Sequence, residues 1–133
     1  VGLDKKYQMF YAALSLNYYD CDPADLDLAK TMRDLQKKYA PYEYVPDTHF
    51  YASFGHLDGY SAMYYSYMWA EVIAKDMFSR FEKEGILNPA IGKKYRDTIL
   101  APGGSKDAAD LVKDFLGRPY SFEPFAKWLE GGK

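Results

Sequence analysis

The chain has 133 residues, a formal net charge of −2 and a single cysteine, Cys21. This length is enough for one domain, or for a piece of one, with a substantial hydrophobic core. The slight acidity gives no general attraction to nucleic acid or to an anionic membrane, and no apolar run approaches the roughly 18 residues that a membrane span needs. One cysteine excludes an internal disulfide and a four-cysteine metal site. We therefore expect a cytoplasmic protein without nucleic-acid or membrane partners.

The first third of the sequence has a helical period. Over about 3–19, apolar side chains recur at spacings of three and four, which predicts a helix with one face in the core. Asp22 followed by Pro23 is typical of a helix N-terminus and predicts a second helix that continues to about Tyr39, just before another proline. The stretch 41–54 has no pattern and is expected to be a loop, and long loops in compact domains are often functional.

A histidine in a glycine-flanked loop leads directly into a run of tyrosines. Tyr60, Tyr64 and Tyr67 follow the spacing i, i+4, i+7 and would share one face of a long helix expected over about 58–84. His56 lies just upstream of that face if the loop folds back. A core normally prefers leucine or valine at such positions, because a buried hydroxyl without a hydrogen-bond partner costs about 1 to 3 kcal/mol. We therefore expect something polar opposite the three phenols.

Three shorter helices are expected after the longest one. Asn88 and Pro89 form the cap and first position of one helix, Ser105 caps the next, which ends at Gly117, and Ser121 opens the last. Nothing alternates with a period of two over a length that would make a sheet. The sequence predicts an all-α fold of about six helices.

No motif for self-contained catalysis is present. The two histidines, His49 and His56, are not the i, i+4 pair of a zinc protease, and the chain contains no HExxH. Ser53, His56 and Asp58 are neighbours in one loop, and such neighbours seldom point at one another as a hydrolase triad must. The glycines at 103–104 are more typical of a turn between helices than of an anion site. We expect no metal ligands in this chain.

Several segments nevertheless resemble, in order and spacing, the C-terminal end of the thimet oligopeptidase family of zinc metallopeptidases. The resemblance is specific over about 50–119, whereas 1–49 is similar only in its helical, aromatic-rich character. The segments that carry it are HLDGYSAMYYSYMWAE at 56–71, EGILN at 84–88, YRDTILAPGGS at 95–105 and FLGRP at 115–119.

The resemblance implies part of a mostly helical enzyme that binds short peptides in a deep channel and cleaves them with a zinc-activated water. In that family an HExxH helix and a more distant glutamate hold the zinc, and both lie upstream of the segment seen here. Residues 1–133 would then be a C-terminal portion of the catalytic domain. Zinc would be bound only in the complete enzyme, where the same polypeptide or a partner chain supplies the HExxH portion. The chain alone should be inert.

The resemblance also implies roles for individual residues. His56, Tyr60 and Tyr67 would face the substrate, with Tyr64 beside them. The Tyr67 and Tyr60 hydroxyls would donate hydrogen bonds to the oxyanion that forms on the peptide carbonyl, because a neutral phenol with a pKa near 10 is a suitable donor. His56 would donate to a substrate carbonyl.

The glycines of this loop would let it adjust around the peptide. Gly55 and Gly59 flank His56 on its two sides. Many members of the family have two adjacent glycines before the first tyrosine, whereas this chain has Asp58 and Gly59 and is one residue shorter.

Two other interpretations remain open at this point. In one, the tyrosines line a groove of a non-catalytic helical module that holds a peptide or a partner helix without cleaving it. Alternatively, they form an interface that docks on the rest of the protein. The chain begins at Val1 rather than at a methionine, so we expect a processed chain or a piece of a longer polypeptide.

Overall fold

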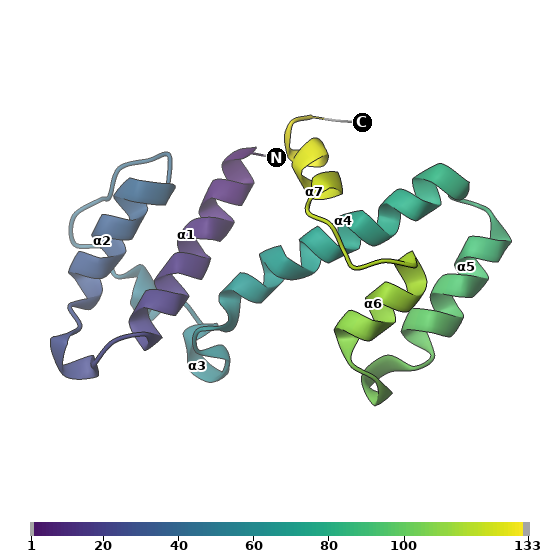
Figure 1. The fold of residues 1–133 in the computed structure, drawn as a ribbon. Helices are drawn as coiled ribbons and strands as arrows, with labels where there is room; N and C mark the ends of the chain where they lie inside the picture. Colours follow the sequence, from purple (N-terminus) through teal and green to yellow (C-terminus); the bar gives the residue numbers. More distant parts are fainter. Residues whose placement is uncertain (1, 132–133) are drawn as a thin grey trace. The chain divides into compact units, whose positions relative to one another are not determined.

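The protein is helical in the computed structural model, which describes residues 2–131 (Figure 1). Those residues contain no β-strand, which confirms the all-α prediction. Their contacts divide the chain into two compact units, one up to Met68 and the other from Trp69 on. The α-helices of the described residues are α1 (Gly2–Tyr19), α2 (Leu28–Tyr39), α3 (Leu57–Tyr60), α4 (Ser66–Glu84), α5 (Pro89–Tyr95), α6 (Ala108–Leu116) and α7 (Glu123–Leu129).

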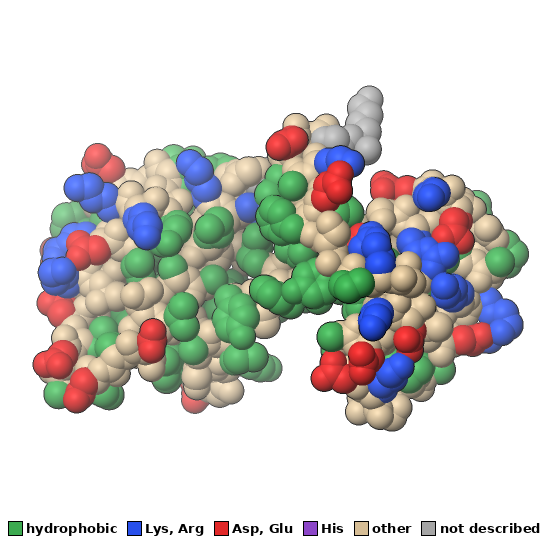
Figure 2. All heavy atoms as spheres, in the orientation of Figure 1, with side chains coloured by type: hydrophobic (Ala, Val, Ile, Leu, Met, Phe, Trp, Pro, Cys, Tyr) green, Lys and Arg blue, Asp and Glu red, His purple; other side chains and the backbone are tan. Residues whose placement is uncertain are grey.

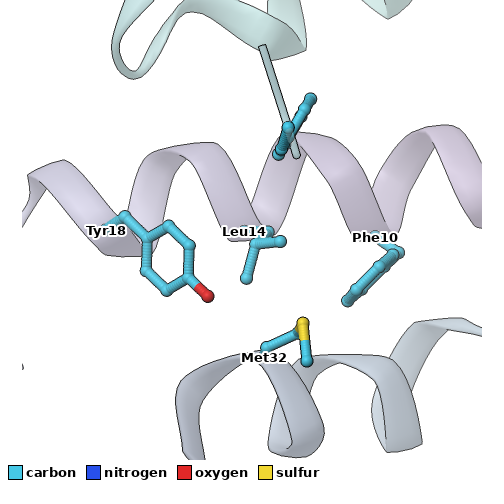
Figure 3. Close-up of a cluster of buried hydrophobic side chains, with 5 residues drawn as sticks. Phe10, Leu14, Tyr18 and Met32 are labelled. Carbon is cyan, nitrogen blue, oxygen red and sulfur yellow. The ribbon is translucent and has the colours of Figure 1, made fainter. Parts of the chain in front are cut away.

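The core of the first unit forms between α1 and α2. Phe10, Leu14 and Tyr18 of α1 are buried along one side of the helix, as the apolar spacing predicts. They face Met32 of α2, and Figure 3 shows this arrangement. Phe54, from the loop before α3, is buried in the same cluster. Since α1 contributes most of these side chains, it is the element on which the rest of the first unit packs.

The second helix begins at Leu28, so the predicted start at Pro23 is wrong. Asp22 accepts a hydrogen bond from the Ala24 N–H, but the turn that it caps is a 3₁₀ turn of three residues. The chain then becomes extended at Leu26, whose side chain packs on the core. A second aspartate, Asp27, caps α2 by accepting from the Lys30 N–H at 2.9 Å.

The longest helix also begins later than predicted, at Ser66 instead of near residue 58. Gly59 has a φ of 92° and Ser61 a φ of 47°, and these left-handed conformations break the helix between α3 and a 3₁₀ turn at Met63–Tyr65. The end of the helix is as predicted, because α4 stops at Glu84 and Gly85 follows it with a φ of 102°.

The second unit has its own core, which packs around α6. Leu111, Val112 and Phe115 are buried there, as is Ile91 of α5. The Asn88 side chain caps α5 as predicted, and Gly117, with a φ of 74°, ends α6 as predicted. The turn after α5 is a π-helix at Arg96–Leu100.

The predicted cap of α6 is wrong. Asp107, not Ser105, caps this helix by accepting from the Ala109 N–H at 2.8 Å. Ser105 belongs instead to a 3₁₀ turn at Gly103–Ser105. At the next helix, Phe122 occupies the cap position without a side-chain hydrogen bond, and Ser121, one residue earlier, accepts from the Glu123 N–H at 3.2 Å.

A buried aspartate ties the segment after α6 to α4. Asp76 has no exposed surface and accepts two hydrogen bonds from Arg118, at 2.8 and 2.6 Å, and one from the Ser121 N–H at 2.6 Å. Three donors therefore satisfy the carboxylate that the fold has removed from water.

Charged side chains of both signs are scattered over the surface in view. In Figure 2, basic and acidic side chains lie among one another on each of the two units, in keeping with the small net charge of −2. Within residues 2–131, no helix combines the length and the apolar character that crossing a membrane requires.

Candidate functional site

Four side chains predicted for the site come together in the first unit. The His56 Nε2 atom lies 3.3 Å from the Tyr67 hydroxyl. The His56 ring lies 6.0 Å from the ring of Tyr60, 4.9 Å from that of Tyr64 and 5.7 Å from that of Tyr67, measured between centroids. The Tyr64 and Tyr67 rings meet edge to face at 5.1 Å. We call His56, Tyr60, Tyr64 and Tyr67 the His–Tyr cluster.

The cluster does not lie along one helix, so the expectation of a single helical stripe is wrong. Tyr60 ends α3, Tyr64 lies in the 3₁₀ turn and Tyr67 in the first turn of α4. The break at Gly59 and Ser61 separates Tyr60 from the other two. The 3₁₀ turn places residues three apart on one side, which keeps Tyr64 beside Tyr67. The chain thus gathers the predicted residues by folding the loop, not by helical periodicity.

The three phenols differ in exposure. The side chains of Tyr60 and Tyr67 are 64% and 55% exposed. Tyr64 is half-buried, contacts the rings of Tyr11 and Phe54, and donates a hydrogen bond to Gln8 Oε1 at 3.0 Å. Burial is the main cause that raises the pKa of the Tyr64 hydroxyl. Tyr64 therefore anchors the cluster to the core, while Tyr60 and Tyr67 present hydroxyls to the outside.

Helix α1 holds the loop of the cluster at two points. The Tyr19 hydroxyl donates to the Leu57 carbonyl at 2.6 Å, and the Ser15 hydroxyl donates to the Ser61 carbonyl, also at 2.6 Å. Ser15 is fully buried. Neither residue is predicted from the sequence. The only sequence signal for Ser15 is that this polar residue stands next to Leu14, on the side of the helix that faces the core.

The two glycines of the loop have different roles. Gly59 needs to be glycine, because its φ of 92° is one that other residues rarely adopt. Gly55 has an ordinary backbone conformation, and a Cβ added there would meet nothing within 4 Å. Only Gly59 is thus required by the backbone conformation.

The arrangement can bind the backbone of a peptide. Each exposed phenol can donate a hydrogen bond to a carbonyl oxygen. If the Nε2 atom of His56 carries the proton, it donates to the Tyr67 oxygen and leaves the Tyr67 hydrogen for another acceptor. The exposed ring of Tyr60 adds apolar area for a side chain.

Comparison with known proteins identifies the family of the chain. Residues 2–130 match the sequence profile of peptidase family M3. The chain belongs to this family. The match confirms the resemblance to the thimet oligopeptidase family, which rested on four segments between residues 56 and 119.

Relatives in the M3 family are named as peptidases. The chain is 54% identical over 68 residues to oligopeptidase A of Haemophilus influenzae, which covers 50% of this chain. It is 51% identical over 82 residues, or 59% of the chain, to saccharolysin of Saccharomyces cerevisiae. It is 31% identical over 126 residues, or 95% of the chain, to human mitochondrial intermediate peptidase. These matches span 10%, 11% and 18% of the relatives' own lengths.

The described residues do not form a zinc site. Zinc is held by three or four His, Cys, Asp or Glu ligands, and no group of three such side chains within residues 2–131 is placed to hold a metal ion. His49 contacts Tyr51 instead, with its Nδ1 atom 3.0 Å from the Tyr51 hydroxyl.

A hollow in the second unit has none of the predicted site residues in its lining. Lys75, Arg118 and Trp128 are among the side chains that line it, and none of the His–Tyr cluster is. The Lys75 ammonium sits 3.9 Å from the centre of the Trp128 ring, and Arg118 is bound to Asp76. These basic groups thus already have partners within the unit.

Proposed function

We propose that this chain is the C-terminal, substrate-binding portion of an M3 metallo-oligopeptidase that hydrolyses short peptides. The observation that carries the proposal is the His56–Tyr67 pair, 3.3 Å apart, beside a second exposed phenol at Tyr60. Membership of the family supports peptide hydrolysis as the reaction.

Tyr67 has the main catalytic role in the proposal. Its hydroxyl donates to the carbonyl oxygen of the bond to be cleaved, and this hydrogen bond strengthens as negative charge develops on that oxygen. His56 donates from Nε2 to the Tyr67 oxygen and so fixes the direction in which the phenol hydrogen points. The pair binds and orients the carbonyl without itself transferring a proton.

Tyr60 and Tyr64 support that arrangement in different ways. Tyr60 supplies a second donor to the substrate or to the oxyanion, since its side chain is exposed. Tyr64 contacts the rings of both His56 and Tyr67 and is itself bound to Gln8. It lines the substrate site and holds the other two rings against the first unit. Gly55 and Gly59 form the backbone of the same binding loop.

The rest of the chemistry belongs to polypeptide outside this chain. The described residues offer zinc no site, and the matched region is 18% or less of the relatives whose lengths are compared. We assign the zinc ligands to an HExxH portion of the same polypeptide or of a partner chain. The chain alone is then inert. Its cytoplasmic location stays a prediction, since one relative is named for the mitochondrion.

The proposal is tested with a quenched fluorescent peptide. The 133-residue chain with zinc should give no turnover, and addition of the upstream portion should restore it. In the reconstituted enzyme, Tyr67→Phe should lower kcat by about a hundredfold to a thousandfold, the usual effect of losing an oxyanion donor. Tyr65→Phe is the matched control, because it removes another exposed phenol hydroxyl two residues away and should leave kcat within about twofold.

Three outcomes would count against the proposal. Turnover by the chain alone would contradict the assignment of the metal to another portion. An unchanged kcat in Tyr67→Phe would remove the catalytic role of that hydroxyl. Tight binding of the peptide by the reconstituted protein without cleavage would favour the alternative, a helical module that binds peptides and does not hydrolyse them.

A further inference from the structure

The loop that carries the His–Tyr cluster has a backbone conformation that its own sequence does not favour. The spacing of Tyr60, Tyr64 and Tyr67 is helical, yet the chain is broken between α3 and the 3₁₀ turn. Ser61 has a φ of 47°, a region that residues with a side chain rarely occupy. Contacts from elsewhere in the fold must therefore stabilise this break.

The contacts come from two hydroxyls one turn apart on α1. Ser15 and Tyr19 are at positions i and i+4, and the carbonyls that accept from them, Ser61 and Leu57, are also four residues apart. In a continuous helix those two carbonyls would accept from the N–H groups four residues further on. Here each accepts a hydroxyl of α1 at 2.6 Å. The two bonds thus favour the broken loop over a continuous helix.

We propose that Ser15 and Tyr19 are positioning residues that hold the loop at 57–61 in the conformation in which His56 orients Tyr67 and Tyr60 can bind a peptide. The inference rests on the proposed function, since it concerns the same site. Neither residue touches the peptide. Both act through the loop, so their loss should weaken peptide binding more than it slows the chemical step.

The fold offers a matched control on the same helix. Tyr18, next to Tyr19, donates its hydroxyl to the Leu28 carbonyl at the start of α2, at 2.8 Å, and so makes a bond of the same kind to a different segment. Tyr18→Phe and Tyr19→Phe each remove one phenol hydroxyl. Only the second of these changes should affect the loop.

The first measurement is amide hydrogen exchange by NMR on the whole 133-residue chain. In Ser15→Ala and in Tyr19→Phe, the amides of 57–62 should exchange about fivefold faster, as expected when one hydrogen bond is lost. The ring signals of His56 should shift in the same variants. In Tyr18→Phe, the exchange rates of these amides and the ring signals of His56 should both match the wild type. Tyr19 is about half exposed, so Tyr19→Phe still provides the test if Ser15→Ala does not fold.

The second measurement is kinetic and uses the reconstituted peptidase. Each of the two variants should raise KM for the fluorescent peptide by about fivefold and lower kcat by a smaller factor, because the loop positions Tyr60 and His56, whereas the oxyanion donor Tyr67 itself lies on α4. Tyr18→Phe should leave KM unchanged.

The outcomes separate this inference from the proposed function. Unchanged loop exchange in both variants would overturn the inference, as would a response to Tyr18→Phe as large as the response to Tyr19→Phe. Faster amide exchange in the loop with an unchanged KM would overturn the positioning role but would leave the proposed function intact. A wild-type protein that neither binds nor cleaves the peptide would remove the proposed function, and the positioning role with it.

Discussion

Asp76 shows how a single buried charge is accommodated in this fold. Its carboxylate is fully buried and accepts from Arg118 twice and from the Ser121 N–H. Burial alone would raise the pKa of the Asp76 carboxyl, but the hydrogen bonds from Arg118 and Ser121 outweigh it and hold this pKa below its usual value. The folded second unit therefore favours the ionised form of the carboxyl.

Replacing this carboxylate should destabilise the second unit in a pH-dependent manner. Asp76→Asn should lower the free energy of unfolding by about 2 kcal/mol at pH 7, since it removes hydrogen bonds between charged groups and turns an amide toward Arg118. A carboxyl whose pKa is lowered by folding contributes its full stabilisation when the pH is above its pKa in the unfolded chain, about 4. This contribution is lost as the pH falls through the pKa in the folded chain. The difference between wild type and variant should therefore shrink below about pH 4.

Urea unfolding followed by tryptophan fluorescence measures this effect. The chain has two tryptophans, Trp69 and Trp128, and both lie in the second unit. Asp97→Asn is the control, because the pairs that Asp97 forms with Lys93 and Arg96 are exposed to solvent and should contribute little to stability. A difference between wild type and Asp76→Asn that stays constant down to pH 2 would show that the ionisation of Asp76 does not stabilise the fold.

At the scale of the elements, the sequence predicts where helices lie better than where they begin. Three starts were misplaced, and at two of them, α2 and α6, two adequate capping residues stand close together: Asp22 and Asp27, then Ser105 and Asp107. The residue preferences at helix N-caps allow either residue of each pair. The choice depends on which start lets the following apolar side chains reach the core, and that is a tertiary property.

The cap of α6 gives a direct test of this choice. Asp107→Ala should cost about 1 kcal/mol of unfolding free energy, because the Ala109 N–H loses its acceptor. Ser105→Ala should cost less than about 0.5 kcal/mol, since Ser105 is exposed and lies outside the helix. The same urea unfolding experiment compares the two variants, and an equal loss in both would show that the cap is shared.

The members of the candidate site could be predicted from the sequence, but its geometry could not. The family resemblance indicated His56 and the three tyrosines, and the structure brings their rings together. The break in the helix depends on a hydrogen bond between Ser15 and Ser61, which are 46 residues apart. No spacing rule within the loop contains that bond. A local pattern alone therefore predicted one continuous helix.

At the scale of the whole molecule, the division into two units bears on stability measurements. Each unit has buried apolar side chains of its own, Leu14 and Met32 in the first and Phe115 and Ile91 in the second. The His–Tyr cluster belongs to the first unit and the tryptophans to the second. Fluorescence therefore reports on a part of the chain that does not include the candidate site, and His56 signals report on the part that does.

We also predict that the chain by itself has no tight zinc site, and this prediction is tested on the whole chain. Titration of the 133-residue chain with zinc, followed by calorimetry, should show no stoichiometric site of micromolar or tighter affinity, because the described residues bring no three ligands together. His56→Ala serves as the control, since it should leave the weak residual heats almost unchanged. Tight binding of one zinc ion that His56→Ala abolishes would place a metal site in this chain.

The anchoring of the loop by α1 has a consequence for protein engineering. The stretch from Gly55 to Tyr67 takes its backbone conformation partly from hydroxyls that lie about 40 residues earlier in the sequence, at Ser15 and Tyr19. Transplanting only that stretch into an unrelated helical scaffold would leave its acceptor carbonyls unmatched, and the graft would relax toward a straight helix. A functional transplant would have to bring α1 with it.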